Sequence, residues 1–546
     1  MLATATGPTD VDLLDRTIGA DLEATTARVA DREALVVPHQ DVRWTYRELN
    51  DRVDELARAL LARGFTTGDR IGIWAPNLSE WVLTQFATAK IGVILVNINP
   101  AYRTHEVQYA LNQSGCTGLV AATDFKTSNY VAMVEEVRAD LPELEQVVFI
   151  GTDDWPELLS AADQVSDDEL RAVSAGLSPD DPINIQYTSG TTGFPKGATL
   201  SHRNILNNGY FVARGCGYTE EDRVAIPVPL YHCFGMVMGN LGCTSHGATM
   251  VLPAPSFEPE ATLQAVQNER CTSLYGVPTM FIAALALPDF DSYDLSSLRT
   301  GIMAGSPCPV EVMKQCIETM NMDEVTIAYG MTETSPVSTQ TDRDDPIDAR
   351  VGSVGRVHPH VEIKIVDPKT GETIDRGDGG GEFCTRGYSV MIGYWNDEQR
   401  TADAIDADGW MHTGDLATMD DDGYVNIVGR IKDMVIRGGE NVYPREIEEF
   451  LYSHPRIQDV QVIGVPDEKY GEEIMAWVTT VDGEDISVEE VREYCQGRIA
   501  HYKVPRYVHT TNDFPMTVTG KIQKYQLRDR AVEQLGLESA AGIETA

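Results

Sequence analysis

The segment from Thr188 to Gly197 has the residue types needed to bind a polyphosphate. Its ten residues, TSGTTGFPKG, include four hydroxyls, three glycines and one lysine. Glycines let backbone N–H groups approach phosphate oxygens, hydroxyls donate to those oxygens or reach a bound Mg²⁺, and lysine adds a positive charge. Pro195 stands directly before Lys196, where the Walker A motif requires glycine. The segment therefore predicts ATP binding in a manner different from that of P-loop ATPases.

Other motifs further along the chain could complete a nucleotide site. The run Tyr329–Glu333 follows apolar residues, and an aromatic ring, a glycine and a carboxylate at a strand end suit a purine and a metal-bridged phosphate. Asp415 could accept both hydroxyls of a ribose, although capping of a hairpin explains it equally well. Gly438 and Gly439 would let a narrow substrate pass, or form a simple loop. Lys521 follows Gly520 in a lysine-poor chain, which favours a specific role over a surface one.

Histidine and cysteine usage points away from metal and disulfide chemistry. His232 lies among aromatic and apolar residues, a setting more typical of a packed core histidine than of a catalyst. No His, Asp and Glu residues have the sequence spacing of metal ligands. The nine cysteines are scattered singly, which predicts reduced thiols in a cytoplasmic protein and neither a disulfide framework nor a zinc site. Hydrolase and nicotinamide motifs are missing as well.

The charge balance is strongly acidic. Asp and Glu total 84 against 43 Lys and Arg, which gives a formal net charge of −41. Such a surface repels nucleic acid and anionic lipid, and no apolar run is long enough for a transmembrane helix. Because the acidic residues are spread along the whole chain, we favour adaptation to high salt over an acidic interaction surface. Oligomeric state is not readable from these features, and a homodimer stays open.

Alternating patterns predict an α/β fold that carries these motifs. Leucine and valine follow helical spacing over 49–61, and the apolar runs at 70–74 and 93–97 indicate buried strands. The segment 361–366 alternates with period two, and the turn at 420–423 predicts a hairpin. A compact α+β segment follows Arg430. We therefore predict a large N-terminal domain of several subdomains over 1–430, a hinge at 431–433, and a small mobile α+β domain over 434–546.

The motifs and their order resemble those of the adenylate-forming superfamily, which includes acyl-CoA synthetases, aryl-CoA ligases and peptide-synthetase adenylation domains. The resemblance runs from Trp44-Thr45-Tyr46-Arg47-Glu48-Leu49 to Lys524, through the phosphate loop, Tyr-Gly-Met-Thr-Glu, Thr-Gly-Asp, Gly-Arg-x-Lys-Asp and Thr-Gly-Lys. The segments 97–103 and 124–127 further resemble the medium-chain fatty acyl-CoA synthetase branch.

The resemblance implies a role for each matching position. The implied ATP-binding residues are Thr188, Ser189, Gly190, Thr191, Thr192, Gly193 and Lys196 at the phosphates, Gly305, Ser306, Pro307, Tyr329 and Gly330 at the adenine, and Thr332 at the α-phosphate. Met331 is implied as a further ATP-binding residue. Glu333 with Thr188 would hold Mg²⁺, and Asp415 would bind the ribose with help from Arg430.

The remaining implied roles concern catalysis and domain motion. Lys521 would be the catalytic lysine, and His232 matches an aromatic position near the acyl carboxylate. Lys432 would be the hinge residue, with Asp433 as the alternative. Gly438 and Gly439 would line a tunnel for the pantetheine arm of coenzyme A.

The resemblance implies an ATP-dependent acid–CoA ligase that forms an acyl-adenylate and then an acyl-CoA. Residues 231–235 contain no aspartate of the kind that amino-acid-activating members use to meet an amino group, which favours a simple carboxylic acid, such as a medium-chain fatty acid. The alternatives are an aryl-CoA ligase, an adenylation enzyme that loads a carrier protein, and a non-catalytic nucleotide-binding protein.

The acidic composition generates a prediction about salt. We expect the melting temperature to rise from low salt to molar KCl, because screening reduces the repulsion among the excess carboxylates. Thermal unfolding across a KCl series measures this directly. A stability maximum at low salt would contradict salt adaptation.

Overall fold

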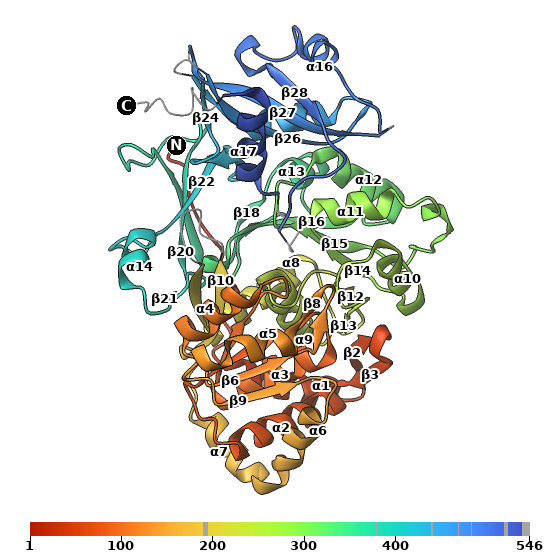
Figure 1. Cartoon of the computed structure of the whole chain (residues 1–546), viewed down its shortest axis with the longest axis vertical. Helices are drawn as coiled ribbons and strands as arrows, with labels where there is room; N and C mark the ends of the chain where they lie inside the picture. The colour runs from red at the N-terminus through yellow and green to blue at the C-terminus, as the bar shows by residue number, and fades with distance from the viewer. Residues whose placement is uncertain are drawn as a thin grey trace.

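Several β-sheets with flanking helices build the molecule, and a small lobe sits at one end (Figure 1). The computed structural model of the 546-residue chain describes residues 1–188, 195–377, 379–437, 440–467, 469–481, 483–517 and 522–537. Helix and strand are mixed throughout, as the sequence predicts.

The first large sheet is mainly parallel and carries the predicted buried strands. Its order is β21 (Gly393–Tyr394), β11 (Lys196–Ser201), β10 (Pro182–Thr188), β5 (Ile94–Asn97), β4 (Arg70–Trp74), β6 (Gly118–Ala121) and β9 (Gln146–Phe149). The strands from β10 to β9 run parallel, whereas β11 and β21 pair antiparallel at one edge. A short hairpin joins β7 (Asp124–Phe125) to β8 (Ser128–Asn129).

The second large sheet has nine strands and a parallel centre. Its order is β18 (Arg356–Val357), β17 (Val337–Gln340), β16 (Glu324–Gly330), β15 (Thr300–Ala304), β14 (Ser273–Gly276), β12 (Arg223–Ala225), β13 (Thr249–Val251), β2 (Glu33–Val37) and β3 (Val42–Thr45). One continuous hydrophobic core contains residues of both large sheets, so the two sheets are held in a fixed relation.

Helices cover these sheets. They are α1 (Ile18–Val29), α2 (Tyr46–Ala62), α3 (Ser79–Ile91), α4 (Thr104–Ser114), α5 (Tyr130–Val137), α6 (Asp154–Ser160), α7 (Asp167–Ala175), α8 (His202–Gly215), α9 (Gly242–His246), α10 (Pro259–Glu269), α11 (Pro278–Leu285), α12 (Val310–Met320), α13 (Ile347–Gly352) and α14 (Glu398–Ala404). The predicted helical spacing over 49–61 is confirmed by α2, whose N-terminus is closed by a capping box between Thr45 and Glu48.

The third sheet is antiparallel and supplies the predicted hairpin. Its order is β1 (Thr4–Thr6), β19 (Val361–Val366), β20 (Gly381–Gly387), β22 (Met411–Met419) and β23 (Val425–Arg430). The turn between β22 and β23 is closed by the N–H of Gly423, which donates to the carbonyl of Asp420 at 3.1 Å. Gly423 has a φ of 85°, which only glycine adopts at little cost.

The C-terminal lobe forms an α+β unit with its own hydrophobic core. Its sheet contains β25 (Glu440–Val442), β24 (Val435–Arg437), β27 (Gly471–Thr480), β26 (Ile457–Asp467) and β28 (Tyr507–Thr510), and its helices are α15 (Pro444–Tyr452), α16 (Val488–Cys495) and α17 (Lys524–Leu535). The core residues of this lobe come from 435 onward. The hinge at 431–433 fits this arrangement and stays a prediction.

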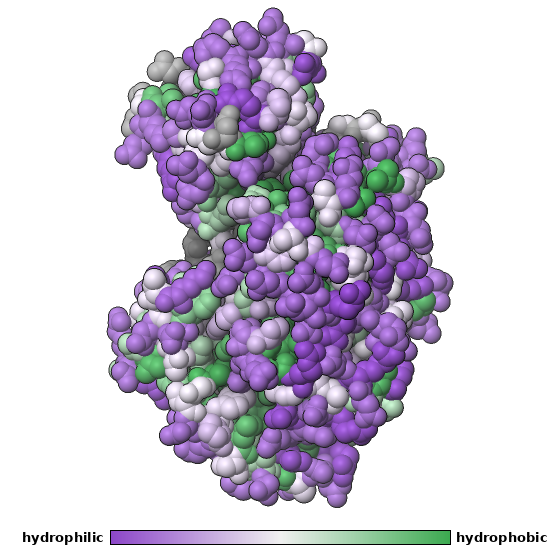
Figure 2. All heavy atoms as spheres, turned by 90° about the vertical axis from the view of Figure 1, so that its right-hand side faces the viewer, coloured by the Kyte–Doolittle hydropathy of each residue, from purple (hydrophilic) through white to green (hydrophobic). Residues whose placement is uncertain are grey.

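The lobe touches the N-terminal part through α15. Arg445 donates to the carbonyl of Cys308 at 3.3 Å, and the N–H of Val310 donates to the Glu449 carboxylate at 3.5 Å. Figure 2 shows an outer surface on which hydrophilic residues dominate and hydrophobic ones form small scattered groups. Within the described residues, no helix is both long and apolar enough to cross a bilayer.

Candidate active site

The predicted phosphate loop connects two paired strands. β10 ends at Thr188 and β11 begins at Lys196, and these two residues are register partners. The strand predicted before the loop is therefore present, and β11 leads directly into α8, which Ser201 caps. The predicted loop residues Ser189, Gly190, Thr191, Thr192 and Gly193 lie outside the described residues.

Glu333 is a buried carboxylate opposite the end of β10. It lies in a short helical turn after β16 and is 5% exposed. The hydroxyl of Thr188 donates to its Oε1 at 3.3 Å, and the phenol of Tyr394 donates to the same oxygen at 2.8 Å. The sequence-predicted magnesium ligands Thr188 and Glu333 are thus in contact across two sheets.

Tyr394 joins the carboxylate to the phosphate-loop lysine. The ammonium of Lys196 lies 4.8 Å from the centroid of the Tyr394 ring, within the range of a cation–π interaction. Burial, reinforced by the negative charge of Glu333, raises the pKa of Tyr394 far above its usual value. The phenol therefore stays protonated and acts as a donor to the carboxylate.

A second cluster of polar and charged side chains is centred on Asp415, which is 8% exposed. The phenol of Tyr329 donates to Asp415 Oδ2 at 2.8 Å, and Arg430 Nε lies 3.1 Å from Oδ1. Asp415 and Arg430 face each other as register partners on β22 and β23. The structure thus brings together three of the residues that the family resemblance assigns to the nucleoside.

A bulge in β22 sets the position of Asp415. The pairing of β20 with β22 jumps from Cys384–His412 to Glu382–Leu416, so extra residues of β22 loop out between these two pairs. Gly414, with a φ of 70°, makes the turn, and its N–H donates to Glu382 Oε1 at 3.1 Å. The bulge therefore depends on Glu382 as well as on glycine.

The residues predicted for the adenine lie at the carboxyl ends of β15 and β16 in the second sheet. β15 and β16 are parallel neighbours, so the segment Gly305–Pro307 and the end of β16 meet at their carboxyl ends. Gly305 has a φ of 88°. A Cβ at position 330 would lie 1.8 Å from the carbonyl oxygen of Pro336. The close approach of this backbone therefore requires glycine, whether or not a ligand binds. Met331 and Thr332 continue this edge towards Glu333.

The segment predicted to meet the acyl group is held by buried amides. Asn97 donates to the carbonyl of Tyr231 at 2.7 Å, Asn184 donates to Asn97 at 2.9 Å, and Gln186 donates to Asn184 at 2.8 Å. The thiol of Cys233 donates to Gln186 at 3.1 Å. This polar chain fixes the backbone around His232 to the first sheet.

His232 is half-buried at the start of an unusual helix. The N–H of Phe234 donates to His232 Nδ1 at 3.2 Å, so the neutral ring carries its proton on Nε2. Phe234–Leu241 form a π-helix, a rare conformation that is frequent at functional sites. The acyl-pocket walls are expected in the segments 231–235, 275–278 and 303–305. The Phe234 and Tyr275 rings, from the first two of these segments, lie 5.5 Å apart.

The predicted C-terminal residues are placed only in part. Gly438, Gly439 and Lys521 lie outside the described residues. Lys432 is exposed in the turn between β23 and β24, and the N–H of Asp433 donates to the carbonyl of Arg430 at 3.0 Å.

Comparison with known proteins decides the family. The model of the AMP-binding enzyme family matches residues 22–395, and that of the AMP-binding enzyme C-terminal domain matches residues 446–521. The chain belongs to the AMP-binding enzyme family. YngI of Bacillus subtilis, named as an acyl-CoA synthetase, is 49% identical over 97% of this chain and 100% of its own length. The medium-chain acyl-CoA ligase ACSF2 of Danio rerio is 46% identical over 96% of this chain and 90% of its own length.

A solved structure supports the fold assignment. The anthranilate CoA ligase AuaEII in complex with anthranoyl-AMP is similar with a TM-score of 0.85 and 28% identity, over 98% of this chain and 100% of that one. The predicted fold class, a large adenylate-forming domain with a smaller C-terminal domain, is thereby confirmed. Within the AMP-binding family the chain groups with acyl-CoA synthetases, and these comparisons support acid–CoA ligation through an acyl-adenylate.

Sequence reasoning missed two parts of this site. Tyr394 was not predicted, although the aromatic pair Tyr394-Trp395 between Gly393 and Asn396 gave a weak local signal. The amide chain of Asn97, Asn184 and Gln186 was missed because Asn97 ends an apolar run and the other two alternate with apolar residues, a pattern typical of ordinary core strands.

Tyr394 provides a test of the Glu333 arrangement. We expect Tyr394→Phe to lower kcat/KM for ATP by about 10- to 100-fold, because a hydrogen bond to a charged group contributes about 1.5–3 kcal/mol. Steady-state kinetics at varied ATP measure the effect. Tyr424→Phe is the matched control, since its phenol donates to the Asp345 carboxylate at 2.7 Å far along the hairpin. Equal losses in both variants would show that Tyr394 has only a structural role.

Proposed function

We propose that this enzyme activates a medium-chain fatty acid with ATP and transfers the acyl group to coenzyme A. The observation that carries the proposal is the contact between Glu333 and Thr188 at the mouth of the phosphate loop, with Asp415 and Arg430 paired beside Tyr329. Glu333 and Thr188 suit the phosphate end of one nucleotide. Asp415, Arg430 and Tyr329 suit its nucleoside end. The names of the relatives YngI and ACSF2 support the acyl-CoA product, and ACSF2 supports the medium chain length.

The phosphate end has the chemistry of a magnesium site. Mg²⁺ prefers hard oxygen ligands and keeps several waters, and the Glu333 carboxylate with the Thr188 hydroxyl offers such a set beside the loop. When bound, the ion would neutralise charge on the phosphates. Tyr394 would orient the carboxylate, and Lys196 would add a positive charge at the same place.

The nucleoside end is preorganised by the bulge in β22. Asp415 would accept the ribose hydroxyls, while Arg430 and Tyr329 hold its carboxylate in one orientation. Gly305, Ser306 and Pro307 would frame the adenine from the neighbouring strand end. Fixing the nucleotide at both ends holds the α-phosphorus in one position for attack by the carboxylate oxygen of the substrate.

The acyl end favours an apolar acid without an amino group. Buried aromatic side chains, Tyr231, Phe234 and Tyr275, lie in the predicted acyl-pocket segments, and His232 Nε2–H could donate to the substrate carboxylate. An aryl acid remains the second candidate, because AuaEII, a structural relative, is an anthranilate CoA ligase. A third candidate is an adenylation enzyme that loads a carrier protein. In that case the acyl group would go to the carrier in place of coenzyme A, and adenylation would be unchanged.

The second half-reaction requires movement of the C-terminal lobe. Lys521 would stabilise the charge that develops during adenylation, and Gly438 and Gly439 would admit the CoA arm afterwards. Because Lys521 and the CoA arm cannot occupy the site at the same time, the lobe would rotate about Lys432 between the two steps. The small contact through Arg445 and Glu449 is compatible with such a rotation.

Two features of the environment also belong to the proposal. Adaptation to high salt is supported by the net charge of −41, and a cytoplasmic location is supported by nine free, buried cysteines. A homodimer stays a prediction, which size-exclusion chromatography with light scattering tests.

A panel of acids tests the activity and the substrate class. We expect pyrophosphate release with C6–C12 fatty acids, weaker release with C4, C16, benzoate and phenylacetate, and acyl-CoA formation only when CoA is added. Pyrophosphate release and mass spectrometry of the products measure both steps. A preference for aryl acids would favour the second candidate, and ATP turnover that ignores every acid would refute the ligase.

Lys521 distinguishes the two half-reactions. We expect Lys521→Ala to slow adenylate formation by on the order of 10²–10³-fold, because it removes a donor to the transition state, while thioester formation from supplied acyl-adenylate is spared. Rapid-quench assays of each half-reaction provide the measurement. Lys314→Ala, which removes a surface ion pair with Glu311, is the control. Equal losses in both half-reactions would contradict the rotating-lobe scheme.

A further inference from the structure

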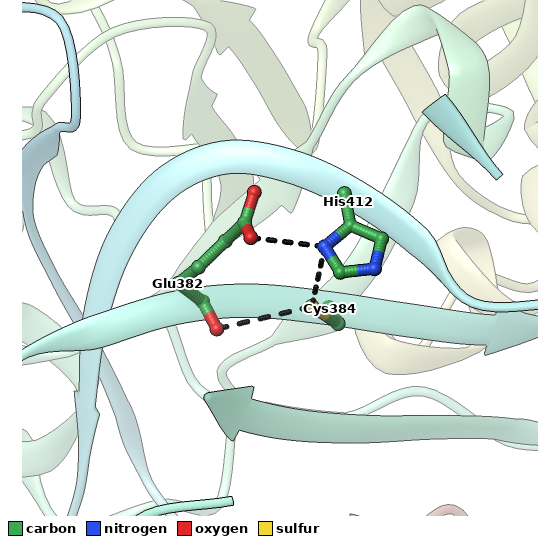
Figure 3. Close-up of side chains that lie close together, drawn as sticks. All are labelled: Glu382, Cys384 and His412. Atoms are coloured by element: carbon green, nitrogen blue, oxygen red, sulfur yellow. Dashed lines mark hydrogen bonds and ion pairs between the residues drawn. The ribbon is translucent and has the colours of Figure 1, made fainter. Parts of the chain in front are cut away.

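A cysteine, a histidine and a glutamate meet on the third sheet beneath the β22 bulge (Figure 3). Glu382 and Cys384 are two residues apart on β20, so they share a face of the sheet, and His412 is the register partner of Cys384 on β22. One ligand atom from each lies within 4.8 Å of the others. Spacing along the sequence did not reveal this cluster, because cross-strand pairing brings together residues that are far apart in the chain.

We propose that Glu382, Cys384 and His412 form a binding site for a zinc-type divalent cation. The donor set of thiolate, imidazole and carboxylate is the set that such ions select. The site is separate from the predicted magnesium ligands Glu333 and Thr188. Its three protein ligands leave a fourth position for water, as His412 and Glu382 are partly exposed.

The distances fit a tetrahedral ion. Usual zinc bond lengths place a sulfur and a nitrogen ligand about 3.6 Å apart in a tetrahedron, and a nitrogen and an oxygen about 3.4 Å apart. Cys384 Sγ lies 3.5 Å from His412 Nδ1, and Glu382 Oε2 lies 2.9 Å from the same nitrogen. Coordination would therefore leave the sulfur in place and move the carboxylate by a few tenths of an ångström, as the ion replaces the proton between these groups.

Asp406 provides the outer partner that metal-bound histidines usually have. Its carboxylate Oδ2 lies 3.6 Å from His412 Nε2. On binding, the thiol proton of Cys384 leaves to solvent and the imidazole carries its proton on Nε2. A small shift of Asp406 would then let its carboxylate accept a hydrogen bond from Nε2–H. Lys364 is the register partner of Cys384 on β19. Its ammonium lies 4.4 Å from the centroid of the Trp410 ring. The carboxylates of Glu382 and Asp406 offset its positive charge.

Occupancy would stiffen the loop that carries Asp415. Glu382 uses Oε2 towards His412, whereas its Oε1 accepts the N–H of Gly414. An ion bound to Oε2 leaves the second bond intact and fixes the carboxylate that supports the bulge. This link to the nucleotide rests on the proposed function, whereas binding of the ion does not.

Metal binding by the purified full-length protein tests the site. Equilibrium dialysis at micromolar Zn²⁺, with millimolar Mg²⁺ to occupy carboxylate-only sites, should give one tightly bound zinc per chain. The Co²⁺-loaded protein should show thiolate-to-cobalt charge-transfer absorption. Cys384→Ser should abolish that absorption, and Cys384→Ser and His412→Gln should each weaken zinc binding at least a hundredfold. Asp406→Asn should weaken it about tenfold, as loss of an outer partner does.

The controls separate a metal site from a hydrogen-bonded cluster. Cys495→Ser removes another buried thiol, in the C-terminal lobe, and should leave zinc stoichiometry and the cobalt spectrum unchanged. If Cys384→Ser does not fold, the cobalt spectrum of the wild type and zinc binding by His412→Gln decide the question. No thiolate absorption in the wild type, or unchanged zinc affinity in the folded variants, would overturn the proposal whatever the enzyme's activity.

Discussion

The burial of one carboxylate constrains the arrangement of the active site. Glu333 belongs to the second sheet, and both hydroxyls that reach its Oε1, from Thr188 and Tyr394, belong to the first. A carboxylate buried to this extent is costly unless hydrogen bonds or a cation compensate it. The two sheets must therefore meet in one arrangement, which places Thr188, at the end of β10, against the turn that follows β16.

The third sheet adds the other half of the site by a local irregularity. A regular ladder between β20 and β22 would alternate side chains above and below the sheet. The bulge breaks that alternation and turns Asp415 towards Tyr329 and Arg430. The neighbouring strand β20 holds Glu382, whose Oε1 accepts a hydrogen bond from the bulge and whose Oε2 contacts His412. The position of Asp415 and the thiol–imidazole cluster are thus mechanically linked.

The sequence predicted the features that local patterns encode. The strand before the phosphate loop, the hairpin at 420–423 and α2 all follow from periodicity and turn residues, and the motif order identified the family. Tyr394 and the Cys384–His412 pair could not be found in this way, because they depend on strand register between residues distant in the chain. The π-helix after Cys233 has an ordinary apolar sequence, so only packing reveals it.

The nine cysteines have a consequence for an enzyme that handles a thiol substrate. All of them are free and buried, and burial raises the pKa of each, to about 12 for Cys233 in the predicted acyl-pocket segment. Only a thiolate attacks an activated carbonyl at a useful rate. The protein's own sulfur atoms therefore cannot compete for a mixed anhydride formed in its interior. An acyl group held there reacts only with a nucleophile that enters from outside the protein, and the chain does not acylate its own thiols.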